Sequence, residues 1–315
     1  MPVQLGAGKN LVGILARPDD AGAVQSQTAV VFLNAGLIHH VGPTRIYVKM
    51  ARRLAHMGFV TLRFDLSGVG DSRVRQDNLS LEDMIVDDLN RVMDYLAVTE
   101  RVQRFVLVGH CGGAFVSLGM ALRDARVIGV VMINAEGGDA GWDSYDLKRK
   151  TSRYYQNYYG RATLTNPEKW KKLLTGKADY GSIIRNVFQN ILWNKLSATA
   201  FRARYAVLGD KSDSTRPEIA NMGDGLRTLA QRDTQILIVY SQGSSGLQRT
   251  RLLVGGELQE LSVAGKLKLE IIPQADHTFT LLASQERLTQ VVASWMRAFI
   301  QESAGSKTTY QEGVI

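Results

Sequence analysis

The stretch 106–115, "VLVGHCGGAF", places the only cysteine of the chain between glycines at a spacing that suits a nucleophile. A short apolar run leads into Gly109, Cys111 follows two residues later, and Gly113 comes two residues after that. This is the G-x-nucleophile-x-G pattern of a sharp strand-to-helix turn, in which flanking glycines avoid steric collisions. The turn holds the thiol at a helix N-terminus, where the helix dipole favours the thiolate. We therefore predict that Cys111 is a nucleophile rather than a structural buried thiol.

A histidine near the other end of the chain has the position expected of a general base. His277 lies in "IIPQADHTF", just after an apolar run, and gives the chain order nucleophile first, base last. The competing histidines are His39, His40, His56 and His110. Of these, His56 falls inside a predicted helix, and His110, next to the cysteine, is expected to point away from the thiol. We predict that Cys111 attacks an acyl carbon while His277 acts as base and then as acid.

Short apolar runs alternate with amphipathic segments on both sides of this turn, and these elements must position the two residues. Two short strands are predicted within residues 1–20, and longer strands at 28–36, 59–66, 104–110, 127–135, 235–242 and 266–273. Helical periodicity covers 44–58, 81–97, a segment from about 112, 248–264 and 284–303. This alternation predicts an α/β protein with a mostly parallel central sheet covered by helices on both faces.

The pattern breaks once, in a long segment after the sixth predicted strand. Residues 139–230 are aromatic, basic and mostly helical in period, and we predict that they form a helical cap (lid). Residues 1–138 and 231–303 are then the core, and 304–315 a flexible tail. Open α/β sheets bind ligands at the carboxyl ends of their strands. The cap is therefore expected to lie at the edge that carries the predicted nucleophile.

Composition and charge exclude several other classes of protein. The chain has 315 residues, one cysteine and a net charge of +8, without an apolar run of 18 residues or a signal-like N-terminus. The lack of a long apolar run predicts that no segment spans a membrane. We also predict a cytoplasmic location, because a single cysteine cannot form an intramolecular disulfide and so suits a reducing compartment. No cofactor and no metal is predicted, since the sequence shows neither a Walker loop nor a Cys/His cluster of zinc spacing. The sequence also lacks a recognition-helix motif, so a nucleic-acid partner is not the favoured explanation of the positive charge.

Three motifs in order, "RFDLSGVGDS", "GHCGGA" and "ADHTF", make the chain resemble the α/β-hydrolases over nearly its whole length outside the cap. The segment 34–72 further resembles bacterial hydrolases and thioesterases associated with exosortase, exopolysaccharide or biosynthetic gene clusters. The resemblance implies an oxyanion hole made of two backbone amides. Carried onto this chain, they are those of Gly36 or Leu37, after the third strand, and of Gly112, after the nucleophile.

The sequence departs from that family at the acid of the triad. Members commonly carry an aspartate after the seventh strand, where this chain has "YSQGSSGL", with Ser244 or Ser245 at the expected place. Three alternatives stay open: the acid has moved to the end of the sixth strand, a serine orients His277, or the site works as a Cys–His dyad. Acidic residues near the end of the sixth strand are Glu136, Asp139 and Asp143, and the first of these is our candidate. Asp65 is expected to be structural, capping the turn after its strand, and Asp276 is expected to point away from its neighbour.

The predicted cap carries a strong positive charge. Residues 145–205 contain 13 Lys or Arg and 3 Asp or Glu, and "RYYQNYYGR" places four tyrosines within six residues. Either a basic face receives an anionic carrier while aromatic residues line an acyl pocket, or the segment is a solvated helical face anchored by tyrosines. We predict an enzyme that processes acyl thioesters carried by an acyl carrier protein or coenzyme A, as a thioesterase or acyltransferase. The alternatives are a small-ester or lactone hydrolase and a non-catalytic binding protein of the same fold.

Overall fold

The structure is a computed structural model, and it describes residues 1–6, 8–18, 26–77, 79–135 and 222–305. These residues belong to one compact unit, which comprises Met1–Leu147 and Ile219–Ile315. A second unit, Lys148–Glu218, lies outside the described residues, as do most of the predicted cap and the predicted tail from 306 onward.

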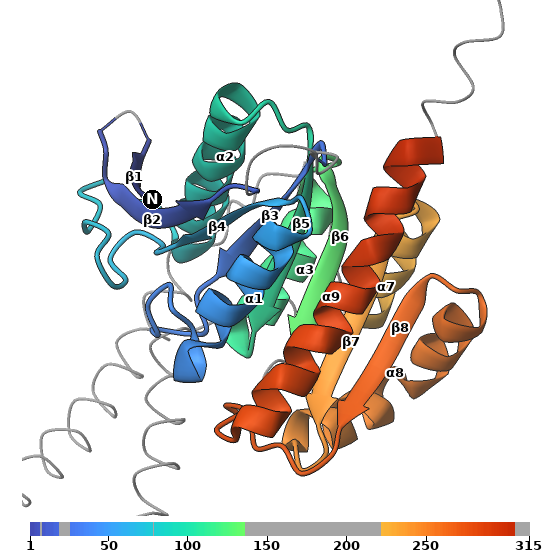
Figure 1. Cartoon of the computed structure of the whole chain (residues 1–315). Helices are drawn as coiled ribbons and strands as arrows, with labels where there is room; N and C mark the ends of the chain where they lie inside the picture. The colour runs from blue at the N-terminus through green and yellow to red at the C-terminus, as the bar shows by residue number, and fades with distance from the viewer. Residues whose placement is uncertain (7, 19–25, 78, 136–221, 306–315) are drawn as a thin grey trace, which may run out of the picture. The chain divides into compact units, whose positions relative to one another are not determined.

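An eight-stranded sheet forms the centre of the described unit (Figure 1). Its strands are β1 (Pro2–Leu5), β2 (Leu11–Ala16), β3 (Thr28–Leu33), β4 (Val60–Phe64), β5 (Arg104–His110), β6 (Val127–Ile133), β7 (Gln235–Ser241) and β8 (Leu267–Ile272). The order across the sheet is β1-β2-β4-β3-β5-β6-β7-β8. Strands β3 to β8 all run parallel to one another, whereas β2 is antiparallel to both of its neighbours, β1 and β4. The predicted mostly parallel sheet is thus confirmed.

Helices cover both faces of this sheet (Figure 1). They are η1 (Pro43–Arg45), α1 (Ile46–His56), α2 (Leu81–Thr99), α3 (Gly112–Arg123), α7 (Met222–Gln231), α8 (Ser245–Val263) and α9 (Leu282–Gly305). Helices α1 and α9 pack on one face, and α2, α3, α7 and α8 pack on the other. None of the described helices combines the length and apolar content needed to cross a bilayer.

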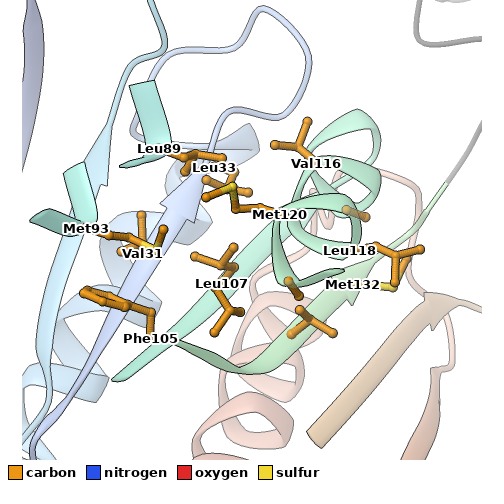
Figure 2. Packing of buried hydrophobic residues seen from close by; sticks show 14 of the residues in the cluster. Val31, Leu33, Leu89, Met93, Phe105, Leu107, Val116, Leu118, Met120 and Met132 are labelled. Carbon is orange, nitrogen blue, oxygen red and sulfur yellow. The ribbon is translucent and has the colours of Figure 1, made fainter. Parts of the chain in front are cut away.

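The two faces exist because the central strands direct apolar side chains to both sides of the sheet. Along β5, Phe105 and Leu107 pack against α2 and α3, while Val106 and Val108 pack against α1 and α9. Successive side chains of a strand point to opposite faces, so a strand buried on both sides must be a continuous apolar run. Figure 2 shows the first of these layers, with Met120 of α3 among the labelled residues. Each fully buried side chain of this size contributes about 1.5–3 kcal/mol.

One helix of the core comes from the segment that the sequence assigns to the cap. Helix α7 begins inside residues 139–230, yet its Leu226 and Leu229 are fully buried in the core beside α3 and α8. The sequence pattern could not separate this helix from the rest of the insertion, because both have helical periodicity. The rest of the predicted cap, 139–221, lies outside the described residues.

Candidate active site

Cys111 lies at the sharp turn between β5 and α3, as its glycine spacing predicts. Its backbone has φ 55° and ψ −116°, values that side-chain-bearing residues rarely adopt. The Cys111 N–H donates to Ile133 O at 2.9 Å, which ties the turn to the end of β6. The side chain is half-buried, and its sulfur makes no capping hydrogen bond to α3. The turn therefore presents a thiol at the carboxyl end of β5.

Two glycines make this turn sterically possible. A Cβ on Gly109 would lie 2.0 Å from Gly113 O, a distance that no packed structure allows. A Cβ on Gly113 would lie 2.5 Å from Asn34 O, at the end of the neighbouring strand β3. The first turn of α3 thus packs directly on the backbone of both strands. This close approach brings the loop after β3 next to the turn that carries Cys111.

The loop after β3 carries the second predicted oxyanion amide. Gly36 has φ 63°, and Ile38 N–H donates to Ala35 O at 3.2 Å to close the turn. Leu37 is 48% exposed, so this part of the loop faces outward. Gly112 is the first residue of α3, where a backbone N–H has no acceptor within the helix. Both predicted amides therefore lie on adjoining segments at the same edge of the sheet.

Asp65 holds this loop in place from the end of β4. Its buried carboxylate accepts hydrogen bonds from Asn34 Nδ2 (2.8 Å), from His40 N (2.6 Å) and Nδ1 (2.8 Å), and from Asp71 N (3.1 Å). Burial raises the pKa of Asp65, but the hydrogen bonds from His40 and Asn34 outweigh burial, so the pKa lies below its ordinary value. The structural role predicted for Asp65 is confirmed, and the carboxylate also anchors the loop after β3.

A group of three residues in this anchor, His40, Asp65 and Asp71, has ligand atoms within 4.8 Å of one another. Such spacing can suit a metal ion, and Asp71 is exposed. However, both carboxylate oxygens of Asp65 already accept two hydrogen bonds each. His40 Nδ1 is directed at the same carboxylate. The hydrogen bonds account for the cluster without an ion.

His277 lies in the loop after β8, and two residues at the ends of other strands bind its backbone. The carbonyl oxygen of His277 accepts from His110 Nε2 and from Asn134 Nδ2, each at 2.8 Å. The imidazole rings of His110 and His277 have centroids 4.9 Å apart. The predicted base is thus attached to the residue next to Cys111. Contacts between a nucleophile and its base commonly tighten only when substrate binds.

Asn134 links three strand ends and was missed by reasoning from the sequence. Its fully buried side chain donates to His277 O, and its Oδ1 accepts from Ser241 N at 2.7 Å and from Ser241 Oγ at 3.2 Å. The residue has φ 42°, a conformation that asparagine tolerates better than most residues. The sequence signal was an asparagine directly after a buried strand. His110 was likewise expected only to point away from the thiol, and its contact with His277 joins segments 167 residues apart.

Some candidates for the triad acid, or for a group that replaces it, lie among the residues that the structure describes, and others do not. Glu136, Asp139 and Asp143 lie outside the described residues. Ser244 is the N-cap of α8, where its hydroxyl accepts from Gly246 N at 3.1 Å. Asp276 directs its carboxylate to its own turn, where it accepts from the backbone N–H and hydroxyl of Thr280. The expectation that Asp276 points elsewhere agrees with these contacts, and the identity of the acid stays a prediction.

A sharp glycine-flanked turn joins a central parallel strand to a helix, and the loops after β3 and β8 lie at the same edge of the sheet. This arrangement is that of one fold. The chain has the α/β-hydrolase fold. The family model described as serine aminopeptidase, S33, matches residues 25–177, a little under half of this α/β-hydrolase-fold chain. That description names a serine, whereas the turn of this chain holds Cys111.

Solved structures resemble this α/β-hydrolase-fold protein along most of its length. A proline iminopeptidase from Mycobacterium smegmatis is 13% identical, with a TM-score of 0.54, over 96% of this chain and 100% of that one. Est1E from Butyrivibrio proteoclasticus is 13% identical, with a TM-score of 0.54, over 95% and 99%. A carboxylesterase structure from Nitrososphaera gargenis is 15% identical, with a TM-score of 0.53, over 93% and 96%. At sequence identities this low, the structural match establishes a shared fold and not a shared activity.

Two curated proteins match shorter stretches. The uncharacterized protein PA2218 of Pseudomonas aeruginosa is 27% identical over 138 residues, which are 41% of this chain and 35% of that protein. The uncharacterized protein YcjY of Escherichia coli is 31% identical over 87 residues, 27% of this chain and 28% of that protein. The chain thus spans about a third of the length of these curated relatives.

Proposed function

We propose that this protein cleaves activated acyl compounds, thioesters and carboxylic esters, through a covalent acyl-Cys111 intermediate. The observation that carries the proposal is the backbone of Cys111, with φ 55° at the junction of β5 and α3. Strain of this kind persists only where the surrounding structure enforces it, and it is concentrated at functional sites. Gly109 and Gly113 enforce it through contacts that any side chain would prevent.

The chemistry has two halves. Sγ of Cys111 attacks the acyl carbon, and His277 accepts the thiol proton and returns it to the leaving thiol or alcohol as the bond to the acyl carbon breaks. Water then attacks the acyl-cysteine with His277 again as base, which releases the carboxylic acid and the thiol. Backbone amides of Gly112 and of Gly36 or Leu37 are the proposed donors to the tetrahedral oxyanion. Removing one such donor typically costs about 3–4 kcal/mol of transition-state stabilisation.

Thioesters are the substrate class that the cysteine favours over simple esters. A thiolate exchanges readily with a thioester because the attacking and leaving atoms are both sulfur. Carriers of acyl thioesters are anionic, and the basic segment 145–205 offers them a complementary charge, although it lies outside the described residues. The carrier, the acceptor and the likeness to hydrolases of biosynthetic gene clusters remain predictions. The carboxylesterase name of one structural neighbour favours carboxylic esters as the second substrate class.

A matched pair of substrates tests both parts of the proposal. Butyryl-N-acetylcysteamine and p-nitrophenyl butyrate carry the same acyl group on sulfur and on oxygen. We expect turnover of the thioester and a mass increase of one butyryl group on the protein, both lost in Cys111→Ala and partly retained by Cys111→Ser. Thioester turnover that persists unchanged in Cys111→Ala would show that another group is the nucleophile. Turnover of the oxygen ester alone would assign the chain to the ester hydrolases.

A further inference from the structure

Three arginines lie on or beside α1 and β4, which pack against each other. Arg63 lies in β4, Arg45 ends η1 and Arg52 lies in α1. Thr61, two residues before Arg63 and hence on the same face of the strand, donates its hydroxyl to Ala51 O of α1 at 3.3 Å. This contact places the Arg63 side chain on the α1 face of the sheet. Figure 1 shows α1 on the face that α9 also covers.

Arg63 is largely buried and makes few hydrogen bonds for a guanidinium, although none of its nitrogens is a fully buried atom without a partner. The residue is only 8% exposed, yet its side chain makes one hydrogen bond, from Nη1 to His40 O at 3.3 Å. A guanidinium has five N–H donors, and a buried charge is costly unless it is paired. Burial lowers the pKa of Arg63, and the positive charges of Arg52 and Arg45 lower it further. Arg45 and Arg52 therefore act on Arg63 as like charges.

Within the part of the chain that the structure describes, no carboxylate forms an ion pair with Arg45, Arg52 or Arg63. Other arginines of the core do form such pairs, namely Arg17, Arg75, Arg91, Arg123, Arg126 and Arg227. The carboxylate whose charge acts on Arg63 is that of Asp65. Its oxygens are directed at donors of the loop after β3 and of Asp71. The cluster thus concentrates positive charge that the described core does not neutralise.

The cluster is open on one side. Ile14 of β2 pairs directly with Arg63 across the antiparallel ladder, and it is only half-buried. Arg45 and Arg52 are both exposed; Arg45 is the N-cap of α1, and Arg52 lies in α1 seven residues later. A ligand can therefore approach along the edge of α1 and meet the buried guanidinium at its base.

We propose that Arg45, Arg52 and Arg63 form a binding site for a phosphate group. Guanidinium groups match phosphate oxygens with two parallel hydrogen bonds, and three positive charges suit a dianion better than a carboxylate. A bound phosphate would accept hydrogen bonds from the Arg63 donors that the described structure leaves unused. Inorganic phosphate and the phosphate of a small phosphorylated compound share this chemistry. The inference does not depend on Cys111 being a nucleophile.

Binding to the full-length protein tests the proposal by isothermal titration calorimetry at low ionic strength, with no turnover involved. The probes are inorganic phosphate, 4′-phosphopantetheine and pantetheine, which lacks the phosphate. We expect the two phosphate-bearing probes to bind and pantetheine not to bind. If 4′-phosphopantetheine binds at least tenfold more tightly than inorganic phosphate, the site takes a phosphorylated compound, and equal affinities identify free phosphate as the ligand. Absence of phosphate binding at concentrations up to about 10 mM would overturn the proposal.

Variants assign any binding to these residues. The double variant Arg45→Gln, Arg52→Gln changes only exposed positions, so its fold should be retained, and we expect the dissociation constant for phosphate to rise at least about tenfold. Arg63→Gln should abolish binding, with circular dichroism checking its fold. Arg53→Gln is the matched control, because Arg53 is an exposed neighbour of Arg52 on the same helix, and it should change the constant less than twofold. An equal loss in Arg53→Gln and in the double variant would show only a general effect of charge.

Discussion

The two hydrogen bonds that converge on the His277 carbonyl make a sharp prediction about coupling between distant residues. His110 ends β5 and Asn134 follows β6, and each donates to the same oxygen at 2.8 Å. His110→Phe removes one donor while keeping an aromatic ring of similar size against His277. Asn134→Ala removes the other donor. Because the two donors share one acceptor, the effects of the two substitutions should not add.

The expected magnitudes follow from the partners of each side chain. His110→Phe leaves the carbonyl one donor and should lower the free energy of unfolding by about 1–2 kcal/mol. Asn134→Ala also leaves the buried Ser241 N–H without its acceptor, so it should cost about 2–4 kcal/mol. In the double variant the carbonyl loses both donors, and this adds about 1 kcal/mol beyond the sum of the single effects.

Urea unfolding of the four proteins measures this coupling energy. The control pair is His110→Phe with Ser241→Ala, because Ser241 contacts Asn134 but not the carbonyl, so the effects of this pair should add. If the His110 and Asn134 effects add within about 0.3 kcal/mol, the loop of His277 is not held in the way we describe. If His277 is the base, kcat for thioester cleavage should also fall about tenfold or more in the double variant, with KM little changed, since a small displacement of a catalytic group slows chemistry.

Three further predictions concern the turn, the anchor and the cap of α8. Gly109→Ala should lower the unfolding free energy by about 3 kcal/mol or more, because its Cβ would meet Gly113 O at 2.0 Å, whereas Gly243→Ala, with open space around its Cβ, should change it by less than about 0.5 kcal/mol in the same urea titration. Because the folded-state pKa of Asp65 is lowered, its contribution to stability is present above its unfolded-state pKa of about 3.9 and is lost as the pH falls through the folded-state pKa. The Asp65→Asn variant should therefore be less stable than the wild type at pH 7. Between pH 5 and pH 2 it should lose less stability than the wild type, as urea midpoints across that range would show. Ser244→Ala should cost about 1 kcal/mol through loss of the α8 N-cap and leave thioester kcat within twofold, and a much larger fall in kcat would instead support a serine that orients His277.

Much of the fold could be predicted from the sequence because its signals are local. Continuous apolar runs indicate strands buried on both faces, and their alternation with amphipathic segments indicates a parallel sheet. The turn at Cys111 was predictable for the same reason, since Gly109 and Gly113 are required by contacts within five residues of chain and with the adjacent strand. The boundary near α7 was not predictable, because helical periodicity is the same in a cap and in a core.

The contacts that hold the site together join residues far apart in the chain, and only the tertiary structure decides them. Nothing around His110 or Asn134 in the sequence indicates that both bind the backbone of His277, because the hydrogen bonds span 167 and 143 residues. Likewise, Asp65 was predictable as a turn residue but not as the anchor of the loop after β3, whose donors come from 25 to 31 residues away. The sequence by itself determined which residues can do chemistry at the turn, through local sterics and spacing. The folded sheet decided what positions them, because it alone brings the carboxyl ends of β3 to β8 to one edge.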